Sequence, residues 1–359
     1  MTLRLVATRI IGLSLLLIGA CSTNSPQPFV LTGGAPSQPF SGGDIATTGG
    51  TLGTGGLVLG SGGDLPTTGG TMAVVTGGTD ASVTGMDASM GDAAINGTGG
   101  ASSSPLPTPT DYGATGPFSD AKMFTNVGPS SNYTLFRPDD ASLGRDGIKH
   151  PIVAWGNGIS TNPTQYESLL TTIASHGFVI IATNDTTVER PAMSAGLDWL
   201  VEQNDTAGPM QGKLDVTKEA TIGYSWGGGA AIDTADRPNV LATVSFHGMP
   251  PRGDQAAFDA MHAPLLLFTS TGDTFVSRSG FVQPNYDASI VQTALAEHEG
   301  YSHTTPLLTP GDAGDERAPA IAWLYLWVYG EHDAEKFFYG ADCILCMAPW
   351  TDFDTKNWQ

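Results

Sequence analysis

Short apolar runs alternate with segments of helical spacing over residues 111–359. The apolar runs suited to buried strands are residues 151–155, 178–182, 220–223, 241–246 and 264–269. The helices predicted between and after them cover residues 162–177, 192–203, 288–298 and 318–329, and the first opens with Asn162 as N-cap before Pro163. This alternation predicts a doubly wound, mostly parallel sheet with helices on both faces. In such a sheet, functional side chains gather at the carboxyl ends of the strands.

The N-terminus has the pattern of an export signal. A short basic start is followed by an apolar stretch at residues 10–20, too short to cross a bilayer. The sequence Leu17-Ile18-Gly19-Ala20-Cys21 resembles the lipobox of bacterial lipoproteins. The resemblance implies that residues 1–20 are removed and that Cys21 carries a lipid, while an ordinary signal peptide with an incidental cysteine is the alternative. Ser22 favours sorting to an outer membrane, if the cell has one.

Residues 21–110 are rich in Gly, Thr, Ser and Pro, with Gly-Gly pairs that recur from position 33 to position 99. A segment with so few large apolar groups cannot offset its backbone entropy by burial, so we predict a flexible tether. A Gly-rich structural or adhesive repeat is the alternative. The remaining residues, 111–359, are long enough to form one domain with a sizeable core.

The charge of the chain argues against two classes of binding partner. The chain has 35 acidic and 15 basic residues, for a formal charge of −20. Binding to nucleic acid or to anionic lipid requires Lys and Arg, so neither is an expected partner. We expect a monomer that touches a membrane only through the lipid on Cys21, with its folded domain in the periplasm or on the cell surface.

The segment Gly223-Tyr224-Ser225-Trp226-Gly227 fits the nucleophile-elbow pattern Gly-x-Ser-x-Gly. The turn strains the serine backbone and therefore needs small neighbours on both sides. An apolar strand precedes it and a predicted helix follows, which is the required context. A Gly-rich packing turn is the alternative interpretation, but the pattern predicts Ser225 as a nucleophile.

A serine nucleophile needs a base, and the base needs an orienting carboxylate, which follow the elbow in the order acid, then histidine. Asp273 lies just past the strand at residues 264–269, and His303 lies in a polar turn after the predicted helix that ends near His298. We predict Asp273 and His303 for these roles. The weaker rivals are His247, which precedes Asp273, His298, predicted to face solvent, His176, predicted at a helix end, and the loop charges Asp254, Asp312 and Asp315.

Two backbone N–H groups should stabilise a developing oxyanion. We predict those of Trp226, after the nucleophile, and Asn157, in the glycine-flanked loop after the first predicted strand. The residues predicted to line the substrate pocket are Trp155, Tyr224, His247 and Met249.

Several of these segments together resemble one family. The strings Ala174-Ser175-His176-Gly177-Phe178-Val179-Ile180, Gly223 to Gly229, Gly272-Asp273 and Ser302-His303 are similar to the cutinase-like and polyester (poly(ethylene terephthalate)) hydrolase branch of the α/β-hydrolases. The resemblance implies a serine carboxylesterase that uses no metal or organic cofactor. Its substrate would be a small-molecule or polymeric ester. Asn157 stands where the polyester-degrading members have an aromatic residue, and Trp226 where they have Met.

Three alternatives to an ester hydrolase remain open from the sequence. The same three residues could serve a peptidase or acyltransferase, and the chain could be a tethered binding lipoprotein on an inactive hydrolase scaffold. For Cys343 and Cys346, a disulfide is the first interpretation in an exported protein. Free thiols or a redox pair are the others.

Overall fold

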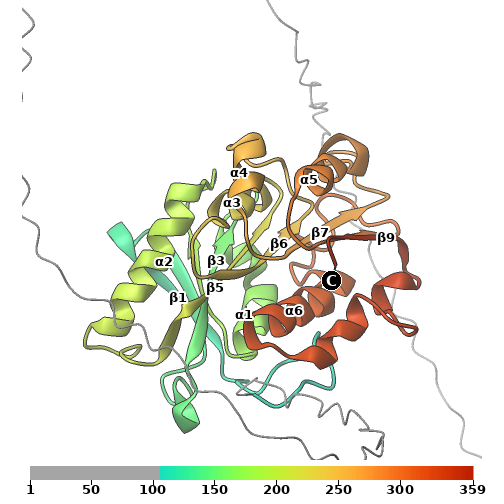
Figure 1. Ribbon diagram of the computed structural model, residues 1–359. Helices are drawn as coiled ribbons and strands as arrows, with labels where there is room; N and C mark the ends of the chain where they lie inside the picture. The colour runs from blue at the N-terminus through green and yellow to red at the C-terminus, as the bar shows by residue number, and fades with distance from the viewer. Residues whose placement is uncertain (1–105, 359) are drawn as a thin grey trace, which may run out of the picture. The chain divides into compact units, whose positions relative to one another are not determined.

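Nine strands form one mixed sheet in the computed structural model, which describes residues 106–358 (Figure 1). The strands are β1 (Lys122–Val127), β2 (Tyr133–Arg137), β3 (His150–Gly156), β4 (Val179–Thr183), β5 (Leu214–Tyr224), β6 (Val240–Phe246), β7 (Leu265–Ser270), β8 (Thr293–His298) and β9 (Trp350–Lys356). Their order is β1-β2-β4-β3-β5-β6-β7-β8-β9. The predicted signal segment, Cys21 and nearly all of the predicted linker lie outside the described residues.

The centre of the sheet is parallel and its edges are antiparallel. Strands β4, β3, β5, β6, β7 and β8 pair in parallel. At one edge β2 pairs antiparallel with β4 and with β1, and at the other β9 pairs antiparallel with β8. This arrangement is the α/β-hydrolase fold and confirms the predicted fold class.

Helices cover both faces of the sheet, because its central strands bury side chains on both sides. The α-helices are α1 (Glu167–Ser175), α2 (Arg190–Asp205), α3 (Trp226–Thr234), α4 (Asp254–Ala260), α5 (Gln283–Ala288) and α6 (Arg317–Leu324). The shorter helical turns are Pro129–Ser131, Arg145–Gly147, Pro163–Tyr166, Arg278–Val282, Gly314–Glu316, Tyr325–Tyr329, His332–Phe337 and Ile344–Cys346. One core cluster joins α1 and α6 to one face, and two others join α2, α3 and α4 to the opposite face.

The predicted helix over residues 288–298 is wrong. Residues Thr293–His298 form β8, which pairs with β7 on one side and β9 on the other. The Ala-, Leu- and Glu-rich composition favours a helix locally, but both Ala294 and Leu295 are fully buried, one on each face. Tertiary pairing therefore overrides the local preference.

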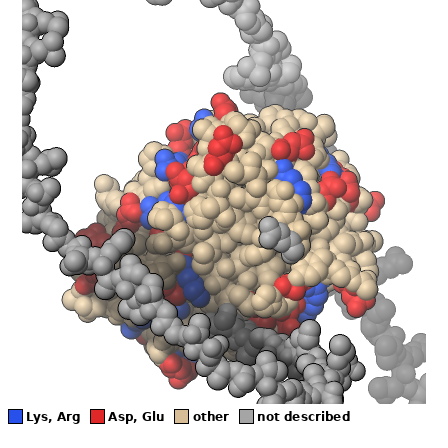
Figure 2. Space-filling model, in the orientation of Figure 1, with Lys and Arg blue, Asp and Glu red and all other residues tan. Residues whose placement is uncertain are grey.

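On the face shown in Figure 2, charged side chains lie mostly around the rim and the centre is largely uncharged.

Cys343 and Cys346 are joined by a disulfide. Within residues 106–358, no helix combines the length and the apolar character that crossing a bilayer requires.

Candidate active site

Ser225 occupies the turn between β5 and α3 in a strained backbone conformation. Its φ and ψ are 55° and −117°, a region that side-chain-bearing residues rarely adopt. The turn is held from both sides, since Ser225 N–H donates to Phe246 O at 2.9 Å and Met249 N–H donates to Ser225 O at 2.9 Å. The sequence-predicted elbow is therefore anchored to β6 and to the loop that follows it.

The glycines of the elbow are needed because three backbone segments meet there. A Cβ on Gly223 would lie 2.1 Å from Gly227 O, and a Cβ on Gly227 would lie 2.1 Å from Gly156 O. Both distances are far inside van der Waals contact with backbone atoms. Only glycine lets the start of α3 approach the end of β5 and the loop after β3 this closely.

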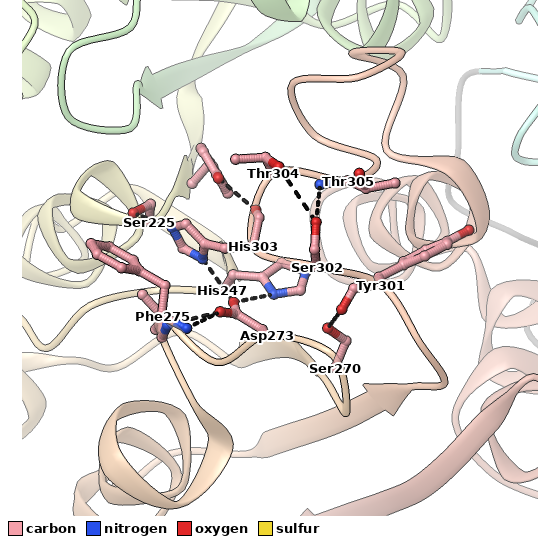
Figure 3. Close-up of polar contacts among 12 residues, drawn as sticks. Ser225, His247, Ser270, Asp273, Phe275, Tyr301, Ser302, His303, Thr304 and Thr305 are labelled. Carbon is pink, nitrogen blue, oxygen red and sulfur yellow. Dashed lines mark hydrogen bonds and ion pairs between the residues drawn. The ribbon is translucent and has the colours of Figure 1, made fainter. Parts of the chain in front are cut away.

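The structure brings Ser225, His303 and Asp273 together, although 78 and 30 residues separate His303 from the other two (Figure 3). The distance from Ser225 Oγ to His303 Nε2 is 2.8 Å, and that from His303 Nδ1 to Asp273 Oδ2 is 2.7 Å. With Nδ1 protonated, His303 accepts from the serine hydroxyl and donates to the carboxylate. A hydrogen-bond chain of this kind can activate a serine hydroxyl as a nucleophile.

The Asp273 carboxylate is buried and accepts several hydrogen bonds. Oδ1 accepts from the N–H groups of Phe275 and Val276 at 3.0 and 2.8 Å. Oδ2 accepts from His247 Nδ1 at 3.0 Å in addition to His303. Burial alone would raise the pKa of Asp273, but the hydrogen bonds from His247, His303 and Val276 outweigh it and hold the pKa well below its usual range. The carboxylate is therefore ionised at neutral pH.

Asn157 and Trp226, whose N–H groups we predicted to bind an oxyanion, lie in the segments that meet at the elbow. Trp226 is the first residue of α3, where N–H groups have no acceptor within the helix. The Asn157 side chain is locked, since Oδ1 accepts from Trp155 Nε1 at 2.9 Å and Nδ2 donates to Thr183 O at 2.7 Å. These bonds fix the orientation of the loop that carries the Asn157 N–H.

Three of the four residues predicted to line the pocket are buried beneath it. Trp155, Tyr224 and His247 are at most 2% exposed, so direct contact with substrate does not fit their positions. Each instead supports a loop or a side chain of the site. The Tyr224 hydroxyl donates to His303 O at 2.6 Å, and its ring stacks on the His303 ring. Met249 is half-buried against the cluster that contains α4.

Two residues that the sequence did not indicate also contact this site. Phe275 is 65% exposed, and its ring lies 5.0 Å from the His303 ring. Glu316, at the end of the turn before α6, is fully buried with Oε1 at 2.9 Å from His247 Nε2. Phe275 could have been found from its place two residues after Asp273. Nothing near Glu316 in the sequence distinguishes it from the surface charges around it.

Of the rival histidines, His247 lies beside Asp273 in the site, and His298 and His176 lie outside it. His298 is buried at the end of β8, where Nε2 lies 2.9 Å from Asp315 Oδ2, so the prediction that it faces solvent is wrong. Its ring stacks on Tyr301 at 3.6 Å, in the loop that leads to His303. His176 caps the end of α1, as predicted, and is buried against Tyr325.

Among the described residues, one group has the spacing of metal ligands, with donor atoms of His247, Asp273 and His303 within 4.8 Å of one another. The Nδ1 atoms of both histidines already lie at hydrogen-bond distance from Asp273 Oδ2. Hydrogen bonds to Asp273 thus account for the short distances among these three side chains.

Comparison with known proteins finds one family model and several relatives that resemble this chain. The family model described as PET hydrolase-like matches residues 101–352. Cutinase est2 of Thermobifida alba is 28% identical over 188 residues, which cover 50% of this chain and 58% of that protein. Cutinase 2 of Thermobifida cellulosilytica is 25% identical over 258 residues, covering 68% of this chain and 90% of that protein. Bis(hydroxyethyl) terephthalate hydrolase of Streptomyces coelicolor is 24% identical over 225 residues, covering 60% and 66%. The match of this family model to residues 101–352 shows that the chain belongs to the PET hydrolase-like family.

Proposed function

We propose that this protein hydrolyses carboxylic esters through an acyl-enzyme on Ser225. The observation that carries the proposal is the continuous chain of short contacts from Ser225 Oγ to His303 to the ionised Asp273. The family and the named activities of the relatives support the same class of substrate.

In the proposed reaction, Ser225 Oγ attacks the ester carbonyl carbon while His303 Nε2 takes the hydroxyl proton. The carbonyl oxygen becomes an oxyanion, which the N–H groups of Asn157 and Trp226 stabilise. His303 then gives the proton to the leaving alcohol as the C–O bond breaks. Water attacks the acyl-enzyme with His303 again as base, and the acid leaves as Ser225 regains its proton. Asp273 holds His303 in the Nδ1–H tautomer and stabilises the imidazolium in both steps.

The position of Phe275 favours a substrate ester with an apolar acyl or alcohol group next to the reacting carbonyl. Its exposed ring lies beside His303, so an apolar group bound there would cover part of it (Figure 3). Asn157 and Trp226 differ from the residues of the polyester-degrading members at the same places, and we therefore propose small or oligomeric esters as substrates ahead of intact polymer.

The first test is hydrolysis of a series of p-nitrophenyl esters of increasing acyl length by the full-length protein in detergent. We expect burst kinetics and a loss of more than about 10³-fold in kcat for Ser225→Ala. Stoichiometric labelling of the wild type by a fluorophosphonate, but not of the variant, would identify the nucleophile. A folded wild type that neither labels nor turns over any ester would leave the binding lipoprotein as the better explanation. A preference for amides, or for transfer of the acyl group to an added alcohol, would favour the peptidase or the acyltransferase.

The location is a second part of the proposal. The export signal and lipobox at residues 17–21 support a protein anchored to the bacterial envelope by a lipid on Cys21. We expect wild-type protein in the membrane fraction and the Cys21→Ser variant in the soluble fraction. Equal membrane recovery of the two proteins would contradict the anchor.

A further inference from the structure

Asp273 is hydrogen-bonded to a second histidine on the side away from Ser225. His247, one residue beyond the end of β6, places Nδ1 at 3.0 Å from Asp273 Oδ2, the oxygen that also receives His303. Its other ring nitrogen, Nε2, lies 2.9 Å from Glu316 Oε1. The contacts thus continue from Ser225 through His303, Asp273 and His247 to Glu316.

This extension lies entirely within the protein. The side chains of His247, Asp273 and Glu316 are all fully buried. The second carboxylate oxygen of Glu316, Oε2, has no hydrogen-bond partner among the residues that the structure describes. His247 also has φ of 46°, a conformation that costs free energy in a non-glycine residue and persists only where the surroundings impose it. A buried carboxylate with one partner and a strained histidine between two acids both require an explanation.

The geometry indicates which protons are present. Both ring nitrogens of His247 face carboxylate oxygens, and a neutral imidazole can donate from only one of them. With both carboxylates ionised, two hydrogen bonds therefore require the imidazolium. The environment agrees: burial would lower the pKa of His247, but the charge of Glu316 and the hydrogen bonds to both carboxylates raise it to about 9.

We propose that His247 and Glu316 are positioning residues, which fix Asp273 for its bond to His303 and neutralise one of the two buried negative charges. The inference rests on the proposed ester hydrolase function. With His247 protonated, the group of His247, Asp273 and Glu316 carries one net negative charge, whereas with His247 neutral it would carry two. The Asp273 carboxylate keeps a donor on each side, so its bond to His303 has a fixed direction.

This arrangement should appear in the pH dependence of kcat. The titratable groups around His247 are Asp273 after β7, Glu316 before α6, His303 after β8, whose ring centroid lies 6.1 Å away, and the buried Tyr224 at the end of β5. As the pH rises through about 9, His247 loses its proton and one of its two hydrogen bonds. We therefore expect kcat of the wild type to fall in that range. KM should stay unchanged, because His247 and Glu316 are both fully buried and do not contact the substrate.

The experiment compares Glu316→Gln and His247→Gln with two matched controls. Glu219→Gln alters another buried glutamate, paired with Arg237, and His176→Gln alters another buried histidine. Rates of p-nitrophenyl ester hydrolysis are measured from pH 6 to 10 and divided by the active sites that a fluorophosphonate titrates. In Glu316→Gln the alkaline decline of kcat should move down by about one to three pH units, because the nearest charge that holds the proton is gone. His247→Gln should lower kcat about tenfold or more and lose that decline. The controls should lose thermal stability only.

The failures of the two proposals can be told apart. An active wild type whose pH profile is shared by Glu316→Gln and His247→Gln would overturn the positioning role alone. A folded but inactive wild type would overturn the hydrolase function and this inference with it. If either variant fails to fold, histidine-selective ¹⁵N NMR of the wild type decides the question. We expect one imidazolium with both nitrogens protonated up to about pH 9, and its titration near the ordinary histidine value would refute the proposal.

Discussion

Gly227→Ala tests the close approach of the elbow to the loop after β3. The added Cβ would lie 2.1 Å from Gly156 O, 2.2 Å from Gly156 C and 2.5 Å from Asn157 O. All three are backbone atoms, so no side chain can rotate away. Ordinary contact begins near 3.4 Å, and the loop or α3 must therefore move by about 1 Å.

The displaced atoms belong to the two segments that carry the proposed oxyanion donors, Asn157 and Trp226. A shift of about 1 Å in such a group can cost about 10²-fold in rate. Overpacking of this kind typically costs about 1–3 kcal/mol of stability. We therefore expect kcat of Gly227→Ala to fall about 100-fold, with a smaller change in KM and a Tm lower by several degrees.

The assay is p-nitrophenyl ester turnover per titrated active site, together with thermal unfolding. Gly208→Ala is the matched control, because the nearest atom to its added Cβ is Thr206 O at 4.0 Å. It should leave both kcat and Tm nearly unchanged. If Gly227→Ala keeps kcat and Tm within the range of the control, the packing argument for the elbow is wrong.

Four further results are expected. Phe275→Ala should lower kcat/KM about tenfold for esters with large apolar groups and less for acetate esters, in the same ester series. Tyr224→Phe removes the hydrogen bond to His303 O. It should lower kcat clearly while lowering Tm only slightly, as kinetics and calorimetry on the same variant would show. Glu219→Ala leaves Arg237 with only its bond to the exposed Asp198 and should cost about 1–3 kcal/mol in urea unfolding. Stability should also depend on pH at the alkaline and acidic ends of the range. The raised pKa of His247 stabilises the fold below pH 6.5, and this stabilisation is lost as the pH rises through about 9. The lowered pKa of Asp273 stabilises the fold above pH 3.8, and this stabilisation is lost on acidification. Unfolding midpoints from pH 3 to 10 would measure both limbs, and His247→Gln should lack the alkaline one.

The central strands could be predicted because each is apolar on both faces. Val153 and Ile152 point to opposite sides of β3 and both are fully buried, so the run reads as a strand without alternation. The edge strands could not be found in this way. Lys122–Val127 and Trp350–Lys356 mix polar with apolar residues and are half-exposed, and their pairing depends on neighbours distant in sequence. The same dependence explains β8, whose local composition is that of a helix.

The site could be predicted to the extent that its chemistry lies in short motifs. Ser225, Asp273 and His303 each follow or adjoin a recognisable strand, and chain order supplied their assignment. The buried support is different in kind. Glu316 contacts His247 across 69 residues, and only the folded packing of the turn before α6 against the end of β6 brings the two together.

Tyr224 shows why the variable position of the elbow motif has a structural role here. Because it directly precedes Ser225, the end of β5 that places the nucleophile also places the Tyr224 hydroxyl. That hydroxyl bonds to the backbone of His303 while the ring stacks on the imidazole. The nucleophile and its base lie 78 residues apart, so their register could otherwise vary with any movement of the loop after β8. A single residue beside the serine thus ties the histidine to the same strand, and a residue that the sequence places in the substrate pocket is better understood as part of the frame that holds the site.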